Sequence, residues 1–435
     1  MLISFEFENF RSMKDRQSFT MEGLAMKTKT ENTFEILAKD EKNYRLLKSA
    51  VIYGANGSGK TNFVLALIAL RAMVVRSAFK VTGHSIRQFE PFELEEAYNQ
   101  KPCRFHISFI MDDHCKYNYE VVFNDLEIIL EKLDFYDGIQ PSNLFERNTN
   151  GADIHEVSLG RNLKNKRISK TLFANQLYLS RFGSAEPHEH LTKIFKYFEQ
   201  MELFKSLDRL SIAQLSGRIG KYMIQPENVH FSRLLSSLMN IADEGILGIS
   251  ADISAEEFFS IHAEDNNEEL LQRPGKIRPH AERQVFNAGK ATNTVNFELQ
   301  KKESTGTNIL FAIGGIILQT MQKGGLLVID EFNNGLHPKL SAFLLGLFQD
   351  KKFNRYDAQL IINTHDVALL DKQMFRSDQI WFVNKDEFGV SEMYSAQDFE
   401  GVREDIPYAK WYMAGKFEAV PKLKHANKLG EDEEN

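Results

Sequence analysis

Alternating apolar and polar positions predict extended strands in the first third of the chain. Residues 1–20 alternate between apolar side chains and glutamates, which gives one strand two faces of opposite character. Residues 102–136 alternate in the same way over two stretches, and Asp112, Asp113 and His114 mark the turn between them. We therefore expect an antiparallel sheet near the N-terminus that buries one face.

Apolar residues at helical spacing predict an insertion of helices at residues 185–290. The apolar positions are Leu191, Ile194, Phe195, Phe198 and Met201 in one stretch and Phe231, Leu234, Leu235, Leu238 and Ile241 in the other. Neither stretch continues as heptads, so any projecting arm is expected to be short. Residues 266–293 are polar and contain several prolines and glycines, which predicts a loop that returns to the next domain.

A phosphate-binding loop is predicted at residues 54–61, which read GANGSGKT and match G-x-x-x-x-G-K-[ST] without a gap. The apolar residues 49–53 precede this loop, and a helical stretch at residues 62–70 follows it. Strand, glycine-rich turn and helix are the context in which this motif cradles phosphates. A chance glycine-rich turn is the alternative.

The residues of this loop have different expected roles. Those expected to surround the nucleotide are Gly54, Asn56, Gly57, Ser58, Gly59, Lys60, Thr61 and Asn62. Glycines let backbone N–H groups curl around a phosphate where a Cβ would clash. Lys60 is expected to reach the β- and γ-phosphates of ATP as a catalytic residue, and Thr61 is expected to hold Mg²⁺.

A second motif occurs in the other half of the chain. Residues 325–331 read GLLVIDE, an apolar run that ends in two carboxylates and is typical of a Walker B strand. Asp330 is expected to bind Mg²⁺ through water, and Glu331 is expected to act as the general base on the attacking water. The alternative is an ordinary strand with an acidic end.

Three further segments resemble motifs of ABC-type and SMC-like ATPases. Residues 303–307, ESTGT, precede an apolar helix expected from about Asn308 to Met321 and resemble the signature motif, although their leading residues differ from Leu-Ser-Gly-Gly-Gln. Residues 333–338, NNGLHP, resemble the D-loop. The stretch that ends in His365 resembles the switch strand, whose histidine contacts the γ-phosphate.

This resemblance has consequences for assembly. In ABC-type ATPases the signature motif cannot reach the nucleotide of its own chain. The resemblance therefore implies a head-to-tail homodimer, in which ATP lies between Lys60 of one copy and Ser304 and Gly306 of the other. Gln88 resembles the Q-loop glutamine that links Mg²⁺ to the lobe interface, and an exposed loop glutamine is the alternative.

Nearly the whole chain resembles one family, the AAA-type, SMC-like ATPases of bacterial abortive-infection and restriction-linked loci. These are the RloA-like and AbiL-like proteins, close to the ATPase subunit of the PARIS anti-phage system and more distant from the ATPase domain of OLD-family proteins. Besides the motifs above, the resemblance rests on residues 1–19, 364–366, 378–383 and 412–421. The last block usually reads Gly-Arg-Phe-Gly-Ala-Val-Pro, and Lys416 and Glu418 depart from it.

The fold implied by the resemblance is an α/β P-loop ATPase head of the ABC/SMC-like kind, with an antiparallel β edge and a helical insertion. We expect one ATPase lobe with Walker A at residues 1–184 and the helical insertion at 185–290. A second lobe with signature, Walker B and histidine switch is expected at 291–425, followed by an acidic tail at 426–435.

Composition and charge favour a cytoplasmic protein. The two cysteines, Cys103 and Cys115, have no metal-binding spacing and fit a reduced cytosolic setting. The formal net charge is −7, so the overall charge does not indicate nucleic-acid binding. The apolar stretch at residues 310–318 is shorter than the ~20 residues that span a bilayer, so no membrane partner is expected. Residues 161–170 carry five cations and no acid, which suits nucleic acid or an acidic partner; a solvated loop is the alternative.

We therefore expect an ATPase that converts ATP and water to ADP and phosphate, with ATP and Mg²⁺ bound. The resemblance implies a sensor or scaffold of an anti-phage system that controls a separate effector, a Toprim or RloB-like nuclease. The segment after Tyr412 is too short for a Toprim domain of its own. The alternatives are an SMC-like DNA-repair or DNA-structure ATPase and, less in keeping with the motifs, the motor of a membrane transporter.

Overall fold

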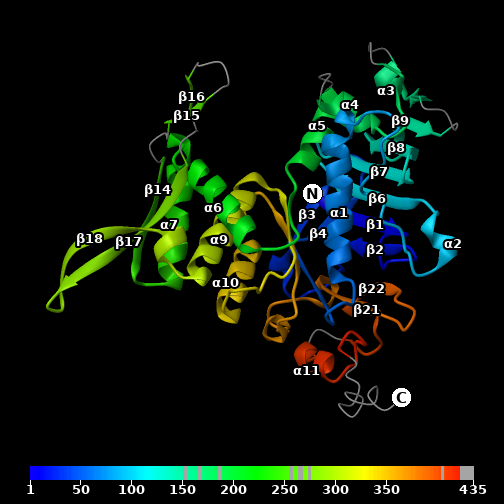
Figure 1. Ribbon diagram of the computed structural model, residues 1–435. Helices are drawn as coiled ribbons and strands as arrows, with labels where there is room; N and C mark the ends of the chain where they lie inside the picture. The colour runs from blue at the N-terminus through cyan, green and yellow to red at the C-terminus, as the bar shows by residue number, and fades with distance from the viewer. Residues whose placement is uncertain are drawn as a thin grey trace, which may run out of the picture. The chain divides into compact units, whose positions relative to one another are not determined.

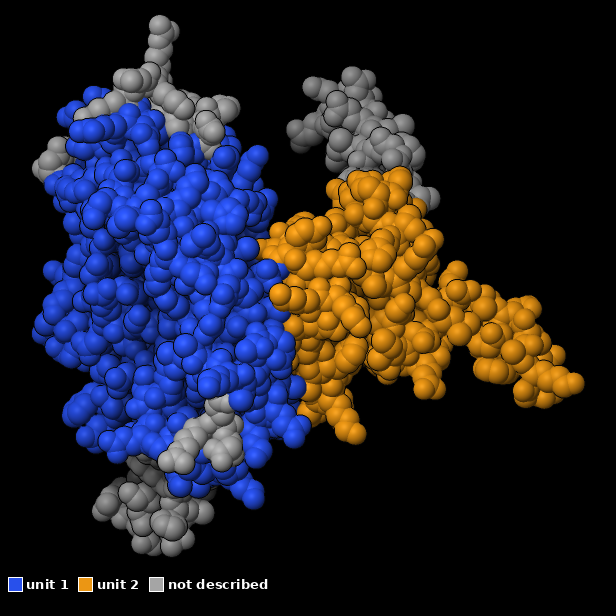
Figure 2. All heavy atoms as spheres, turned by 180° about the vertical axis from the view of Figure 1, so that it is seen from behind, with its two compact units in different colours: residues 1–205, 325–331, 357–435 blue, residues 206–324, 332–356 orange. Residues whose placement is uncertain are grey.

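The structure is a computed structural model. It describes residues 1–149, 154–164, 169–184, 189–253, 258–262, 268–272, 276–402 and 406–421. The chain divides into two compact units, coloured separately in Figure 2. Unit 1 comprises residues 1–205, 325–331 and 357–435, and unit 2 comprises residues 206–324 and 332–356. Each unit thus combines segments that are far apart in the sequence.

A largely parallel sheet of six strands carries the sequence motifs of unit 1 (Figure 1). Its order is β13 (Glu202–Phe204), β19 (Leu326–Ile329), β20 (Gln359–Asn363), β5 (Ser49–Gly54), β21 (Ile380–Lys385) and β22 (Ser391–Ser395). All strands but the antiparallel β22 run parallel. Strands β5, β19 and β20 are buried along their whole length, which explains the apolar residues that fill β19 and the centres of β5 and β20.

A second, antiparallel sheet of seven strands confirms the predicted alternation. Its order is β11 (Ser158–Leu159), β9 (Ser142–Asn148), β8 (Ile128–Tyr136), β7 (Lys116–Phe123), β6 (Cys103–Ile110), β1 (Leu2–Glu8) and β2 (Gln17–Thr20). In β1, Phe5 and Phe7 are buried while Glu6 and Glu8 are partly exposed. The predicted turn joins β6 to β7. The sheet buries one apolar face, as predicted, but residues 1–20 form two antiparallel strands, β1 and β2, rather than one, because the chain turns at residues 9–16.

Helix α1 (Lys60–Arg76) packs its apolar residues against the antiparallel sheet. The ring of Phe63 lies 6.0 Å from that of Phe5 and 4.7 Å from that of Phe19, measured between ring centroids. By length and composition alone, Lys60–Phe79 is the one described helix that could cross a membrane, and 56% of its most apolar window is buried. Burial in the core accounts for the apolar character of α1.

Smaller elements complete unit 1. They are β3 (Thr33–Leu37), β4 (Asn43–Leu47), α2 (Glu96–Asn99), β10 (Ile154–Glu156), α3 (Arg161–Lys164), β12 (Thr171–Phe173), α4 (Tyr178–Ser184), α5 (Glu189–Glu199) and α11 (Tyr408–Met413). Of the cationic stretch at 161–170, residues 165–168 lie outside the described residues, as does the whole of the predicted acidic tail at 426–435. Both therefore stay predictions from sequence.

Unit 2 contains helices and a small antiparallel sheet. The helices are α6 (Arg209–Met223), α7 (Val229–Ala242), α8 (Leu299–Lys302), α9 (Thr305–Lys323) and α10 (Pro338–Gln349). The sheet has the order β14 (Ile246–Ile253), β17 (Ile277–Asn287) and β18 (Lys290–Glu298), and a separate hairpin joins β15 (Phe258–His262) to β16 (Glu268–Gln272). Helix α9 packs against both α6 and α7.

The prediction of a purely helical insertion ending in a loop is wrong in its second half. Helices α5 and α7 form where helical spacing placed them, but α5 belongs to unit 1. Residues 277–298, predicted to be largely loop, form β17 and β18 instead. Strand β18 is exposed over its first seven residues, and a strand exposed on both faces needs no apolar alternation. Its sequence therefore lacks the signal on which strand prediction depends.

The C-terminal block tests whether a glutamate can replace the usual glycine. Glu418 has φ +54°, in the left-handed region, so the turn forms here without glycine. Because a Cβ costs about 1 kcal/mol in this region, Glu418→Gly is expected to raise the free energy of unfolding by about that amount. Chemical denaturation measures it. Glu392→Gly, in the extended strand β22, is the control and should destabilise instead; equal losses in both variants would contradict the assignment.

Candidate nucleotide-binding site

The predicted phosphate loop connects β5 to α1, and its shape depends on glycine. Gly57 and Gly59 have φ values of +77° and +107°. A Cβ on Gly54 would lie 2.4 Å from the carbonyl oxygen of Val383, so this position is closed to other residues. A Cβ on Gly57 would meet nothing within 4 Å. The backbone at the tip of the loop therefore faces open space, as a phosphate cradle requires.

A chain of hydroxyl and amide groups holds the loop from behind. The Oγ of Ser391 donates to the carbonyl of Ser58 at 2.6 Å and lies 2.7 Å from the Oγ of Ser12. The Nδ2 of Asn62 donates to that same Ser12 Oγ at 2.5 Å. Asn62, predicted among the nucleotide-binding residues, thus uses its buried side chain to fix the loop. No local sequence pattern identifies Ser12 or Ser391, because both reach the loop from distant segments.

Lys60 lies at the first position of α1 with its ammonium group on the loop. Its Nζ donates to the carbonyl of Gly54 at 2.7 Å and to that of Ala55 at 2.9 Å. Burial lowers the pKa of Lys60, and the nearby carboxylates of Asp330 and Glu331 partly oppose this shift. A polyphosphate would satisfy this ammonium better than two neutral carbonyls do, because it supplies full negative charge.

Asp330 is buried at the end of β19 and is held by a residue that the sequence analysis did not single out. The Nδ2 of Asn363 donates to Asp330 Oδ1 and to the carbonyl of Lys60, both at 2.9 Å. Asn363 ends β20, which lies between β19 and β5 in the sheet. One amide therefore connects the two motifs. The available signal was a buried amide at the end of a strand whose three central residues are apolar.

We expect Asn363→Ala to lower the affinity of the protein for Mg²⁺, so that ATP turnover needs a higher Mg²⁺ concentration, while the protein remains folded. Without the amide, Asp330 loses the partner that orients its carboxylate, and such losses cost about 10- to 100-fold in metal affinity or activity. The half-saturating Mg²⁺ concentration for ATP turnover measures the effect. Asn384→Ala, partly exposed near the end of β21, is the matched control. An unchanged Mg²⁺ dependence in Asn363→Ala would contradict the orienting role.

The two adjacent carboxylates occupy different surroundings. Asp330 has 3% of its surface exposed, whereas Glu331 is exposed and has φ +54°. A glutamate in the left-handed region is a strained position, which is common at functional sites. Within the described residues, no group of three His, Cys, Asp or Glu side chains could hold a metal by itself. Mg²⁺ suits such a place, because it is often bound by one or two carboxylates together with substrate phosphates.

The remaining predicted residues of unit 1 lie at the ends of the same elements or apart from them. Thr61 is the second residue of α1, and His365 is exposed two residues after β20. Gln88 lies in a turn between α1 and β6, and its Oε1 is buried without a hydrogen-bond partner. No hydrogen bond or ion pair between Gln88 and Lys60 or Asp330 is present among the described residues. The roles of these three residues stay predictions.

The signature-like segment starts helix α9 in unit 2. Ser304 is the N-cap, and its Oγ accepts a hydrogen bond from the N–H of Thr307 at 3.1 Å. The preceding Glu303 accepts two hydrogen bonds from Arg283, whose Nε and Nη2 each lie 2.6 Å from a carboxylate oxygen. The same guanidinium reaches Asp243 at 2.8 Å. These hydrogen bonds raise the pKa of Arg283 and attach the start of α9 to β17.

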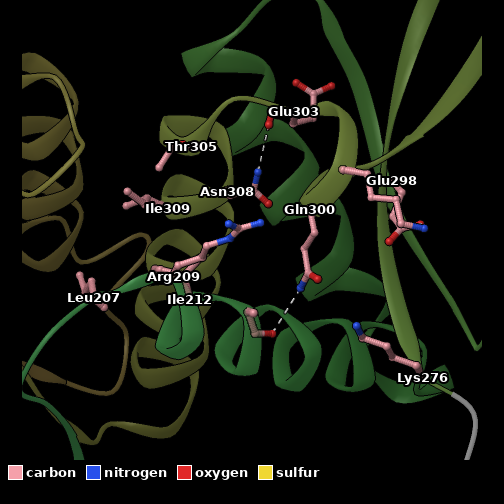
Figure 3. A pocket seen from close by; sticks show the side chains of 12 residues that line it. Leu207, Arg209, Ile212, Lys276, Glu298, Gln300, Glu303, Thr305, Asn308 and Ile309 are labelled. Atoms are coloured by element: carbon pink, nitrogen blue, oxygen red, sulfur yellow. Dashed lines mark hydrogen bonds and ion pairs between the residues drawn. The ribbon is translucent and has the colours of Figure 1, made fainter.

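A pocket of about 460 Å³ opens beside the start of α9 (Figure 3). Its lining residues are Leu207, Arg209, Ile212, Ala213, Lys276, Glu298, Gln300, Lys301, Glu303, Thr305, Asn308 and Ile309. Asn308 donates to the carbonyl of Glu303, and Gln300 donates to that of Ala213. The pocket therefore mixes both signs of charge within unit 2 and is distinct from the phosphate loop of unit 1.

Comparison with known proteins gives a family for the chain. Among curated proteins, none matches the sequence. A solved structure titled "Structure of the recombination mediator protein RecF-ATPrS in RecFOR pathway" is similar, with 10% sequence identity and a TM-score of 0.36 over 90% of this chain and 98% of that one. Residues 49–371, more than half of the chain, match the family described as "AAA domain, putative AbiEii toxin, Type IV TA system". The chain, with its P-loop at the head of α1 and its acidic strand end two strands away, belongs to this family of AAA domains.

Proposed function

We propose that this protein binds and hydrolyses ATP with Mg²⁺, and that a head-to-tail pair of copies forms the complete catalytic site. The observation that carries the proposal is the set of hydrogen bonds from Asn363 to Asp330 and to the backbone of Lys60. They bring the end of the acidic strand to the start of the P-loop helix, although 270 positions separate the two motifs along the chain. This is the arrangement that phosphoryl transfer to water requires.

The residues of unit 1 divide the chemistry between them. Lys60 and the open backbone around Gly57 bind the β- and γ-phosphates of ATP. Thr61, Asp330 and Gln88 would hold Mg²⁺, which supplies positive charge against the phosphates. Glu331, exposed beside the buried Asp330, accepts a proton from the attacking water.

The other half of each site comes from the partner copy. Ser304 is the N-cap of α9 and Gly306 lies in its first turn. Helix α9 has 19 residues, and its N-terminal N–H groups favour an anion. Ser304 is exposed, so the start of α9 lies at the surface of unit 2. We infer that this helix start faces the γ-phosphate bound by Lys60 of the second copy, together with His365 of the copy that binds the nucleotide.

Its biological role is proposed to be that of a sensor or scaffold in an anti-phage defence system that controls a separate effector, such as a Toprim or RloB-like nuclease. The proposal is supported by the AAA family, whose description names a putative AbiEii toxin and a Type IV TA system. The proposed ATP-dependent pair of copies could serve as the two-state element of such a system. Nucleic acid is a further proposed partner, through the cationic stretch that begins at α3.

A phage-protection assay tests this role. Cells that carry the gene with its neighbouring genes are expected to survive phage infection, and Lys60→Ala or Glu331→Gln is expected to remove protection at unchanged protein level. Expression of the chain without its neighbours should not protect. Full protection by this chain alone, or by the Lys60→Ala variant, would contradict the two-component role.

A further inference from the structure

Arg283 of β17 links three segments of unit 2 that are separated in the sequence. It lies on the same face of the strand as Ala281, which is fully buried. Its guanidinium donates two hydrogen bonds to Glu303, just before α9, and a third to Asp243, the C-cap of α7. The end of α7, the middle of β17 and the approach to α9 therefore meet at one charged group.

Glu303 depends on this guanidinium because its side chain is only 5% exposed. A carboxylate taken out of water needs a cation and hydrogen bonds to stay ionised at low cost. Glu303 and Ser304 form the extended link between α8 and α9. The amide of Asn308 holds the carbonyl of Glu303, whereas the carboxylate points away from that amide (Figure 3). The side chain that leads into the signature-like segment is therefore held from β17.

The turn after α7 closely approaches the same guanidinium. A Cβ on Gly245 would lie 2.7 Å from Nη1 of Arg283 and 3.1 Å from Oδ1 of Asp243. The N–H of Gly245 donates to that same Oδ1 at 2.9 Å. The next residue, Ile246, pairs with Arg283, and the register of β14 on β17 changes before Gly248, which marks a bulge. Glycine permits a close approach of the backbone and a bulge re-aims a side chain, and both features occur at Arg283.

We propose that Arg283 is a positioning residue for the shared ATP site, because it fixes the start of α9, and with it Ser304, to β17 and α7. The inference rests on the proposed function, in which this helix start serves the nucleotide of the partner copy. Arg283 acts through Glu303 rather than on the nucleotide itself. The sheet of β14 and β17 thereby becomes part of the ATPase mechanism, since a change in its position reaches the signature-like segment through one ion-paired side chain.

Arg283→Ala is expected to slow ATP turnover by about 10- to 100-fold, because small misplacements of catalytic groups carry penalties of this size. The affinity of a single copy for ATP should not change, since the phosphate loop of that copy lies in unit 1. Steady-state turnover and titration with a fluorescent ATP analogue measure the two quantities. Arg233→Ala, exposed on α7, is the control. Unchanged turnover, or a loss of ATP affinity that matches the loss of turnover, would overturn the role of Arg283.

Mixing variants distinguishes positioning at the partner's nucleotide from general damage to unit 2. Arg283→Ala chains keep an intact phosphate loop, so their equimolar mixture with Lys60→Ala should recover to about a quarter of the wild-type rate. A mixture with Ser304→Arg should stay slow, because every site then contains a defective helix start. If Ser304→Arg recovers with Lys60→Ala but Arg283→Ala does not, the role of Arg283 is overturned and the shared site stands. If neither recovers, the shared site fails and the role of Arg283 fails with it.

Gly245→Ala tests the same contact without leaving Glu303 as an unpaired buried charge. Its methyl group would lie 2.7 Å from Nη1 of a guanidinium that three hydrogen bonds hold in place, so the guanidinium must shift. Turnover should fall with the same mixing pattern, but by less than in Arg283→Ala. Gly217→Ala, on α6, is the matched control, because a Cβ there meets nothing within 4 Å. Equal turnover in the two alanine variants would contradict the positioning role.

Discussion

Replacing Lys60 by alanine is expected to abolish ATP binding, with affinity reduced by at least about 100-fold. The ammonium group of Lys60 lies on the carbonyls of Gly54 and Ala55, at the mouth of a loop whose tip is open. The alanine substitution removes the positive charge with which the loop itself binds the phosphates. Equilibrium titration with a fluorescent ATP analogue measures the loss, and Arg76→Ala, at the other end of α1, is the control.

The same variant is not expected to destabilise the nucleotide-free protein. Burial lowers the pKa of Lys60. Below that pKa the ammonium group is charged in the folded state, and its burial makes the folded state less stable relative to the unfolded state. Alanine removes this cost at neutral pH, together with two hydrogen bonds to carbonyls. A thermal unfolding temperature equal to or above that of the wild type would separate lost binding from lost folding. Wild-type ATP affinity in Lys60→Ala would contradict the P-loop assignment.

Glu331→Gln is expected to keep ATP binding and to slow hydrolysis by about 10²- to 10⁴-fold, the usual contribution of a general base. Glutamine fills the same space at the strained turn after β19, but its amide cannot take a proton from water. Single-turnover hydrolysis measures the effect apart from product release. Glu387→Gln, exposed in the loop between β21 and β22, is the control. An unchanged rate in Glu331→Gln would reject its assignment as the base.

The sequence located those site residues that belong to contiguous motifs. Lys60 starts a helix, and Asp330 directly follows an apolar strand. In each case a short stretch of sequence contains both the residue and its context. Asn363 and Ser391 were missed because their importance comes from sheet order: β20 places one beside Asp330, and β22 places the other behind the loop. No local pattern encodes which strands become neighbours.

The fold shows the same limit. Strands of the antiparallel sheet and the helix at 305–323 could be predicted, because each buries one face or its whole surface and therefore carries a clear period. Strands β17 and β18 could not, since much of their surface is exposed and backbone hydrogen bonds hold them together. Arg283 lies in β17, so its ion pair with Glu303 was not predicted either.

A mixing experiment tests the central claim, a catalytic site shared between two copies, most directly. Ser304→Arg places a bulky cation at the helix start that serves the partner's nucleotide, and Lys60→Ala empties the P-loop, so each variant alone should be inactive. An equimolar mixture contains heterodimers in which one of two sites is intact, and its ATPase rate should recover to at most about a quarter of the wild-type rate. A mixture that stays as inactive as its components, or a Ser304→Arg variant that hydrolyses ATP at the wild-type rate by itself, would contradict the shared site.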